Sequence, residues 1–216
     1  MSKQASNTKY IAVAGNIGAG KSSLTGLLAK HFNWKAFYES VDDNPYLSDF
    51  YEDMRRWSFN LQIYFLSSRF RHQKDMLGEK ISLIQDRTIY EDVEIFAKNL
   101  HEMSLMSDRD FENYEALFRE MSNYLRPPDL LIYLRAQVPT LVRQIQQRGR
   151  DYENTIRIEY LERLNNLYED WIGRYPHEKL IIDTDDIDFV NDQEDLGKVI
   201  ELIEQRLYGL FNELNT

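Results

Sequence analysis

Cysteine does not occur in the 216 residues, so disulfide bonds, thiolate metal sites and cysteine nucleophiles are all excluded. Histidine is scarce as well, with four residues. Positive charge is in short supply, because 26 Lys and Arg residues stand against 36 Asp and Glu residues and give a formal net charge of -10. A chain with this balance has no general attraction to phosphate backbones or anionic lipids, so we expect neither a nucleic acid nor a membrane surface as its partner.

Long apolar runs are also missing. Residues 1–9 are short and polar, and no later run approaches the length of a membrane span, so the sequence predicts a cytoplasmic protein. Hydrophobic residues nevertheless make up 43% of the chain, which is enough to bury a core. No linker, low-complexity segment or internal repeat is visible, and we therefore expect a single domain over residues 1–216.

Five short apolar runs are separated by segments of helix length. The runs are residues 10–14, 36–38, 81–84, 130–134 and 180–182. Near-continuous apolar strands that alternate with helices are typical of a parallel sheet covered on both faces. The right-handed crossover rule then favours an α/β fold with a doubly wound parallel sheet, although the order of the strands cannot be predicted.

A glycine-rich segment follows the first run and precedes a helix predicted from Ser22 to His31. It fits the pattern G-x-x-x-x-G-K-[ST], whose backbone N–H groups bind phosphate, whose lysine adds a positive charge and whose hydroxyl binds magnesium. The alternative is a glycine-rich turn without a ligand, but both the pattern and its context indicate a nucleoside triphosphate site. The residues expected to bind ATP are Gly15, Asn16, Ile17, Gly18, Ala19, Gly20, Lys21, Ser22 and Ser23.

Polar residues on two mostly apolar helices indicate a second, acceptor site. Gln62 and Arg69 are seven positions apart and share one helix face, and Asp92 and Phe96 are four apart on another helix. An amide, a carboxylate and an arginine beside a flat ring can bind the edge of a nucleobase. A purely structural salt bridge between Arg69 and Asp92 is the alternative interpretation.

Taken together, several motifs resemble those of the deoxynucleoside kinases, in the branch that contains deoxycytidine, deoxyguanosine and bacterial deoxyadenosine kinases. The resemblance runs from Tyr10 to about Phe189, and it implies a P-loop kinase fold and, commonly, a homodimer. The matching motifs are Gly15 to Ser22, Glu39-Ser40-Val41, Arg56-Trp57-Ser58-Phe59 leading to Gln62, Ser68-Arg69, Asp86-Arg87-Thr88, Arg148-Gly149-Arg150 and Ile158-Glu159-Tyr160-Leu161.

The resemblance implies catalytic roles for particular residues. Glu39 would be the general base that takes the proton from the nucleoside 5′-hydroxyl. Asp86 would bind Mg²⁺ together with Ser22, and Arg87 would orient Glu39 and the 5′-oxygen. Lys21 would contact the transferred phosphate from the phosphate loop.

A short lid at about residues 148–155 would carry Arg148 and Arg150 over the same phosphate. Relatives often have a further lid arginine where this chain has Gln144, and Arg143 lies one helical step, about a hundred degrees, away from that position. Ser40 replaces a proline that many relatives have after the catalytic glutamate. The base would remain in place, on a slightly looser loop.

The acceptor residues follow from the same resemblance. Tyr51 and Glu153 would bind the sugar 3′-hydroxyl, and the residues that bind or stack on the base would be Gln62, Arg69, Asp92 and Phe96. Adenine and cytosine present an amine to Asp92, whereas thymine presents a carbonyl oxygen that the carboxylate repels.

The expected activity is ATP-dependent 5′-phosphorylation of a deoxynucleoside in deoxynucleotide salvage. Deoxyadenosine is our first choice, because Asp86-Arg87-Thr88 and Asn44-Pro45-Tyr46 resemble the bacterial deoxyadenosine kinases most. Deoxycytidine and deoxyguanosine remain open as acceptors. A nucleoside monophosphate kinase, which the anionic Glu39 disfavours, and a nucleotide-dependent switch module are the alternative functions.

Overall fold

The computed structural model describes residues 8–38, 44–150 and 156–209. In this part of the chain, five strands form one sheet in the order β2-β3-β1-β4-β5, and every neighbouring pair is parallel. The strands are β1 (Tyr10–Gly15), β2 (Lys35–Phe37), β3 (Leu83–Asp86), β4 (Leu130–Arg135) and β5 (Lys179–Asp183). The predicted α/β fold with a parallel sheet flanked by helices is confirmed.

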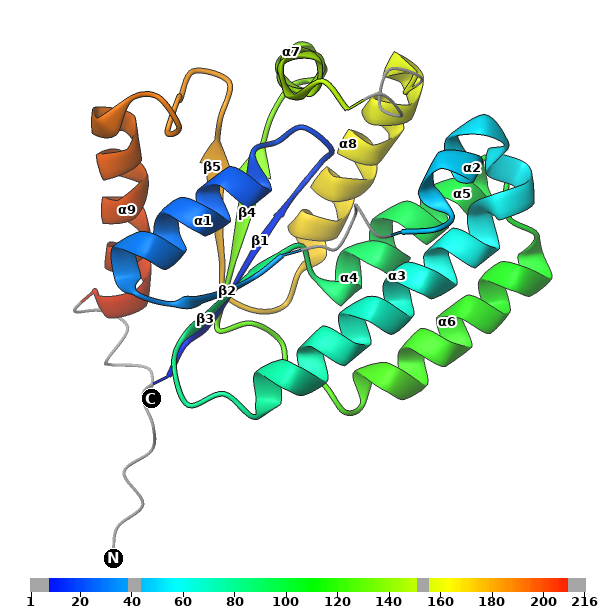
Figure 1. The fold of residues 1–216 in the computed structure, drawn as a ribbon, viewed down its shortest axis with the longest axis horizontal. Coiled ribbons are helices and arrows are strands. Elements are labelled where there is room, and N and C mark those ends of the chain that lie inside the picture. The colour runs from blue at the N-terminus through cyan, green and yellow to red at the C-terminus, as the bar shows by residue number, and fades with distance from the viewer. Residues whose placement is uncertain (1–7, 39–43, 151–155, 210–216) are drawn as a thin grey trace, which may run out of the picture.

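Helices cover both faces of this sheet (Figure 1). On one side lie α1 (Lys21–Phe32), α7 (Val138–Arg148) and α9 (Gln193–Tyr208). On the other side are α3 (Met54–Leu77), α4 (Ile89–Glu91), the π-helix η1 (Asp92–Ala97), α5 (Lys98–Glu102) and α8 (Ile158–Arg174). Two more helices, α2 (Leu47–Glu52) and α6 (Asp108–Ser122), pack outside α3 and η1.

Strand β1 shows why both faces need helices. Its side chains alternate between the two faces, so Ile11 and Val13 join one apolar cluster while Tyr10, Ala12 and Ala14 join the other. All six residues of the strand are buried. A strand buried on both faces reads as a continuous apolar run, which is why its position could be predicted.

Two of the predicted strands include residues that lie outside the observed strands. Ile81 was expected in a strand, but β3 begins at Leu83, because that residue lies opposite both Tyr10 and Lys35, where the two neighbouring strands begin. The side chain of Ile81 is instead 49% exposed. Tyr38, expected in the second strand, lies beyond the end of β2 and is also half exposed.

The parallel register brings two loops together at one edge of the sheet. Val13 of β1 lies opposite Asp86 of β3, so the loop after Gly15 and the segment that begins with Arg87 leave adjacent strands side by side. Ligands of open α/β sheets bind outside the carboxyl ends of the strands, where neighbouring connections run to opposite sides.

Among the described residues, none of the helices has the length and apolar character that a membrane crossing requires.

Candidate active site

The phosphate loop depends on two glycines with left-handed backbone conformations. Gly18 has φ 84° and Gly20 has φ 87°, a region that other residues rarely adopt. A Cβ atom at Gly18 would lie 2.8 Å from the carbonyl oxygen of Leu141, and one at Gly20 would lie 2.9 Å from the ring of Phe189. Both torsion and space therefore require glycine, and the loop packs tightly against α7 and the segment after β5.

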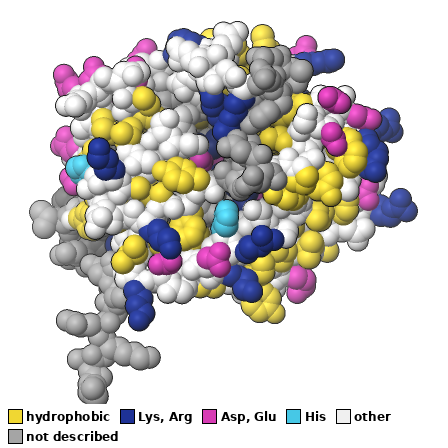
Figure 2. Space-filling view, viewed as in Figure 1, with side chains coloured by type: hydrophobic (Ala, Val, Ile, Leu, Met, Phe, Trp, Pro, Cys, Tyr) yellow, Lys and Arg dark blue, Asp and Glu magenta, His cyan; other side chains and the backbone are white. Residues whose placement is uncertain are grey.

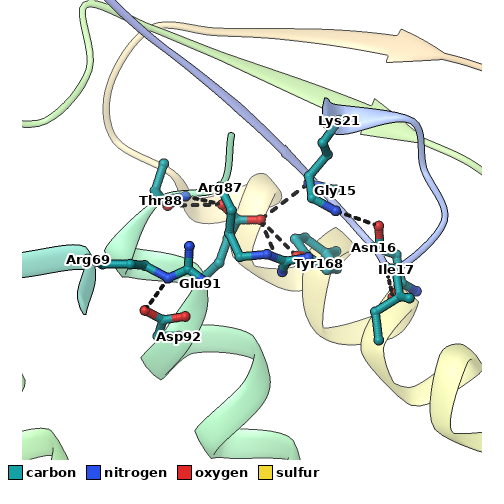
Figure 3. A network of polar contacts seen from close by, with 10 residues as sticks. All are labelled: Gly15, Asn16, Ile17, Lys21, Arg69, Arg87, Thr88, Glu91, Asp92 and Tyr168. Carbon is teal, nitrogen blue, oxygen red and sulfur yellow. Dashed lines mark hydrogen bonds and ion pairs between the residues drawn. The ribbon is translucent and has the colours of Figure 1, made fainter. Parts of the chain in front are cut away.

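Inside the loop, Lys21 folds back over the backbone. Its Nζ donates to the carbonyl oxygen of Asn16 at 2.8 Å (Figure 3). The Asn16 side chain anchors the loop to α8: its Nδ2 donates to the Leu161 carbonyl at 3.0 Å and to Asn165 at 2.5 Å. The buried amide of Asn16 therefore anchors the loop to α8.

Ser22 and Asp86 meet across the two adjacent strands. The hydroxyl of Ser22, in the first turn of α1, donates to Oδ2 of Asp86 at the end of β3. The second carboxylate oxygen of Asp86 is buried and has no hydrogen-bond partner among the described residues. Oxygen ligands from one carboxylate and one hydroxyl beside a phosphate loop are the donor set that Mg²⁺ takes in nucleotide sites, so these residues fit the ion.

A first cavity of about 250 Å³ opens next to this pair. It brings together most of the residues expected from the sequence to act on the acceptor or the transferred phosphate. These residues are Lys21, Ser22, Tyr51, Gln62, Arg69, Asp86, Arg87, Asp92, Phe96, Arg148 and Arg150. Glu39 and Glu153, the expected general base and a sugar ligand, lie outside the described residues, as does most of the expected lid.

At the base-binding end of the cavity, Arg69 and Asp92 form a buried pair. The Nε of Arg69 donates to Oδ2 of Asp92 at 2.6 Å, and both side chains are at most 5% exposed (Figure 3). Gln62 lines the same cavity, and its buried Oε1 has no hydrogen-bond partner among the described residues. Buried acceptors are normally paired, so this oxygen indicates a place for a ligand donor.

The π-helix η1 presents Asp92 and Phe96 to the cavity. Hydrogen bonds from i to i+5 widen the turn, and such segments occur frequently at functional sites. The four-residue spacing predicts that the two side chains share a face, but it does not predict the π-helical pattern. The Phe96 ring also has the guanidinium of Arg87 over it, with the Arg87 Cζ 4.5 Å from the ring centroid.

Arg87 has an unusual backbone for a residue with a side chain. Its φ is +68°, and its N–H donates to the carbonyl oxygen of Val13 at 2.9 Å, which extends the pairing of β3 with β1. Left-handed conformations of such residues cost of order 1–3 kcal/mol and cluster at functional sites. The sequence Asp86-Arg87-Thr88 does not by itself predict this backbone conformation.

A second cavity of about 630 Å³ lies on the other side of the phosphate loop. It shares Lys21, Ser22, Arg148 and Arg150 with the first cavity. Its far wall is the segment after β5, which was not predicted from the sequence and contributes Thr184, Asp185, Asp186, Ile187, Asp188, Phe189, Val190 and Asn191. The available signal was the position of that segment at the carboxyl end of a parallel strand.

Gln144, which stands where relatives often have a lid arginine, and the neighbouring Arg143 both line this second cavity. Gln144 lies beside the phosphate loop, with its Oε1 3.7 Å from where a Cβ of Gly20 would be. Arg143 is exposed at the rim. On the face shown in Figure 2, basic side chains lie below α7, and acidic and basic side chains are mixed over the rest of that face.

Comparison with known proteins agrees with this geometry. A model of the deoxynucleoside kinase family matches residues 11–207, and the chain belongs to that family. A deoxyadenosine/deoxycytidine kinase of Bacillus subtilis is 42% identical over 198 residues, which cover 89% of this chain and 90% of the relative. A deoxyguanosine kinase of Lactobacillus johnsonii is 38% identical, with 91% and 92% covered. The structure of a deoxyadenosine kinase from M. mycoides with bound dATP superposes with a TM-score of 0.81 at 28% identity, covering 91% of this chain and 99% of that one.

Proposed function

We propose that this protein transfers the γ-phosphate of ATP to the 5′-hydroxyl of a deoxynucleoside, with deoxyadenosine as the preferred acceptor. One observation carries the proposal: two cavities, one on each side of the phosphate loop, meet at Lys21, Ser22, Arg148 and Arg150. The larger cavity suits the donor nucleotide, and the smaller one, with its buried polar groups, suits a nucleoside. Membership of the deoxynucleoside kinase family favours this activity over a monophosphate kinase or a switch module.

Phosphoryl transfer in this site needs positioning and charge stabilisation more than covalent chemistry. Glu39 is the proposed base for the acceptor proton, and Arg87 orients the attacking oxygen. Lys21, Arg148 and Arg150 stabilise the negative charge that spreads over the transferred group. Ser22 and Asp86 would hold Mg²⁺, which neutralises charge on the triphosphate when it is bound.

The base preference follows from the acceptor groups of the first cavity. Oε1 of Gln62 accepts hydrogen bonds, and the Asp92 carboxylate, held by Arg69, can accept them as well. Adenine presents an exocyclic amine to these oxygens, whereas thymine presents a carbonyl oxygen. Tyr51, which lines the cavity, and Glu153 are the proposed ligands of the sugar 3′-hydroxyl.

The test is kcat/KM for deoxyadenosine, deoxyguanosine, deoxycytidine and thymidine. We expect at least roughly 10²-fold preference for deoxyadenosine over thymidine, the size of discrimination that unpaired buried polar groups supply. An Arg69→Met, Asp92→Ala double variant should lose most of that preference. Lys74→Met, Asp75→Ala, which changes two exposed residues of the same helix, is the matched control.

Equal wild-type efficiency with thymidine would refute the base assignment and leave the kinase assignment intact. A higher kcat/KM with deoxycytidine or deoxyguanosine would move the preference to that acceptor. Loss of selectivity in the control variant would show that general loosening of α3, rather than the Arg69–Asp92 pair, sets it.

We also propose a homodimer, formed through helices that flank the acceptor site, and a cytoplasmic role in deoxynucleotide salvage. A groove of about 320 Å³ on the outer side of α3, lined in part by Phe59, Ile63 and Tyr64, offers apolar surface for such contacts. Light scattering of the purified protein should give twice the mass of one chain, and a monomeric mass would refute the dimer.

A further inference from the structure

Glu91 is a carboxylate with no exposed surface, placed at the end of α4. Its Oε1 accepts from the backbone N–H of Gly15 at 3.3 Å and from the hydroxyl of Tyr168 at 2.8 Å. Its Oε2 accepts from the N–H of Thr88 at 2.7 Å and from the Thr88 hydroxyl at 3.1 Å. Figure 3 shows this carboxylate in the middle of groups from β1, the segment after β3, and α8.

Arg87 completes the arrangement. Its Nη1 lies 3.7 Å from Oε1 of Glu91 and donates to the Tyr168 hydroxyl at 2.9 Å. Burial is the main cause that raises the pKa of Tyr168 well above its usual value, so its phenol stays protonated and donates to Glu91. Four hydrogen-bond donors and a guanidinium around one carboxylate are what a fully buried carboxylate anion requires.

The groups that Glu91 contacts belong to the two halves of the site. Gly15 is the last residue of β1 and the first residue of the phosphate loop. Arg87 lines the first cavity, the proposed acceptor site, and has a left-handed backbone conformation. One side chain therefore contacts both the loop that binds the donor and the arginine that faces the acceptor.

We propose that Glu91 is a positioning residue, which fixes the Arg87 guanidinium relative to the phosphate loop. The inference rests on the proposed kinase function. The donor phosphate and the acceptor hydroxyl then meet at a constant separation, and misplacement by about 1 Å costs on the order of 10²-fold in rate. The competing explanation is that Glu91 only caps α4 and fills the core.

Steady-state kinetics of the Glu91→Gln variant separate these two explanations. Circular dichroism first shows that the variant is folded. The amide keeps the size of the side chain but loses its charge and turns an NH₂ group toward hydrogen-bond donors. We expect kcat to fall at least roughly 10-fold, while KM for ATP and for deoxyadenosine changes by less than about 3-fold. A purely structural role predicts a lower free energy of unfolding with kcat nearly unchanged.

Glu169→Gln is the matched control. Glu169 accepts from the hydroxyl of Tyr133 at 3.0 Å and from Arg135 at 2.9 and 2.7 Å, so it has the same kinds of partner, and it lines neither the first nor the second cavity. This variant should keep the wild-type kcat. A comparable loss in it would overturn the assignment of a specific role to Glu91.

A double-mutant cycle with Arg87→Lys tests whether Glu91 acts through that arginine. The double variant should be about as slow as the slower single variant, whereas independent effects would multiply. If Glu91→Gln does not fold, Tyr168→Phe serves instead, because it removes a single oxygen that bridges Glu91 and Arg87. We expect it to lower kcat roughly 3- to 10-fold with KM unchanged.

Besides a comparable loss in Glu169→Gln, three outcomes would contradict the inference: a Glu91→Gln kcat above about half the wild-type value, multiplicative losses in the cycle, or a wild-type kcat in Tyr168→Phe where Glu91→Gln is unfolded. Failure of the proposed function looks different. A wild-type protein that phosphorylates no deoxynucleoside overturns both, while an active wild type with an undisturbed Glu91→Gln variant overturns the positioning role alone.

Discussion

Glu39 is the residue whose replacement separates binding from chemistry most directly. A glutamine at this position keeps the shape of the side chain but cannot take a proton from the acceptor hydroxyl. We therefore expect Glu39→Gln to lose roughly 10²- to 10⁴-fold in kcat, the range for a positioned general base, with a smaller change in KM for the nucleoside.

Steady-state kinetics and equilibrium binding of ATP measure the two effects separately. Binding of ATP should stay close to wild type, because the phosphate loop is unchanged. Glu52→Gln, at an exposed position on α2, is the control and should keep full turnover. More than about half of the wild-type turnover in Glu39→Gln would mean that another group is the base.

Individual residues also show how far the sequence could predict the site. Helical spacing paired Gln62 with Arg69 and Asp92 with Phe96, the family resemblance assigned all four to the base, and all four line one cavity. Glu91 was not predicted as a site residue, because the sequence alone does not show whether a glutamate is buried or exposed to solvent. Its burial depends on the register of β1 against β3 and on the packing of α8, and neither is encoded within a short window of sequence.

At the scale of elements, two glycines should respond in opposite ways to the same substitution. Gly18 has a left-handed backbone in the phosphate loop, and an alanine there would approach the Leu141 carbonyl. We expect Gly18→Ala to reduce the free energy of unfolding by at least roughly 1–2 kcal/mol and to raise KM for ATP. Gly173 lies in the last turn of α8, and a Cβ atom there would meet nothing within 4 Å beyond its chain neighbours and the backbone of its own helix, so Gly173→Ala should stabilise the protein by up to about 0.5–1 kcal/mol.

Urea unfolding of the two variants and the wild type measures both changes. Because each variant adds one methyl group, the comparison isolates backbone conformation and local space. A Gly18→Ala variant as stable as wild type would show that the loop relaxes freely. A destabilised Gly173→Ala would show that α8 packs more closely around that position.

Whole elements were easier to predict than their edges. The strands follow from apolar runs between segments of helix length, and the clearest runs are β1 and β4, which are buried along almost their whole length. Where β3 begins depends on its neighbours, since Leu83 lies opposite the first residues of β1 and β2. The order of the strands and the π-helix η1 could not be predicted, because they depend on pairing between distant segments and on a backbone hydrogen-bond pattern that side-chain spacing does not record.

For the whole molecule, ATP should act as a stabiliser when Mg²⁺ is present. A ligand at 100 times its Kd adds about 2.7 kcal/mol, which for a chain of this size corresponds to a rise in Tm of about 5 to 11 °C. Lys21→Ala should lose most of this rise, because the proposed ligands of the lysine are phosphates. In the unliganded protein the lysine donates to the backbone of its own loop, at Asn16, rather than to a core side chain, so the Tm of the unliganded variant should change little.

Thermal unfolding with ATP, with and without EDTA, tests this expectation. The rise in Tm should shrink when EDTA removes the metal. Ser22 and Asp86 are the proposed ligands of Mg²⁺, and without the ion they no longer contribute to nucleotide binding. An equal rise in Lys21→Ala would place the nucleotide elsewhere on the molecule.

The central position of β1 affects the stage of synthesis at which the nucleotide site can form. This strand is near the start of the chain, yet it pairs with β3 on one side and β4 on the other, and the Tyr10 N–H donates to Asp129, 119 residues away. Contacts between such distant segments form slowly, because the entropy of closing the long intervening loop is lost before the contact stabilises the structure. During synthesis, β1 and the phosphate loop leave the ribosome before either flanking strand, and β1 gains its second partner only after β4 has emerged, so the sheet around the nucleotide site is completed only at that stage.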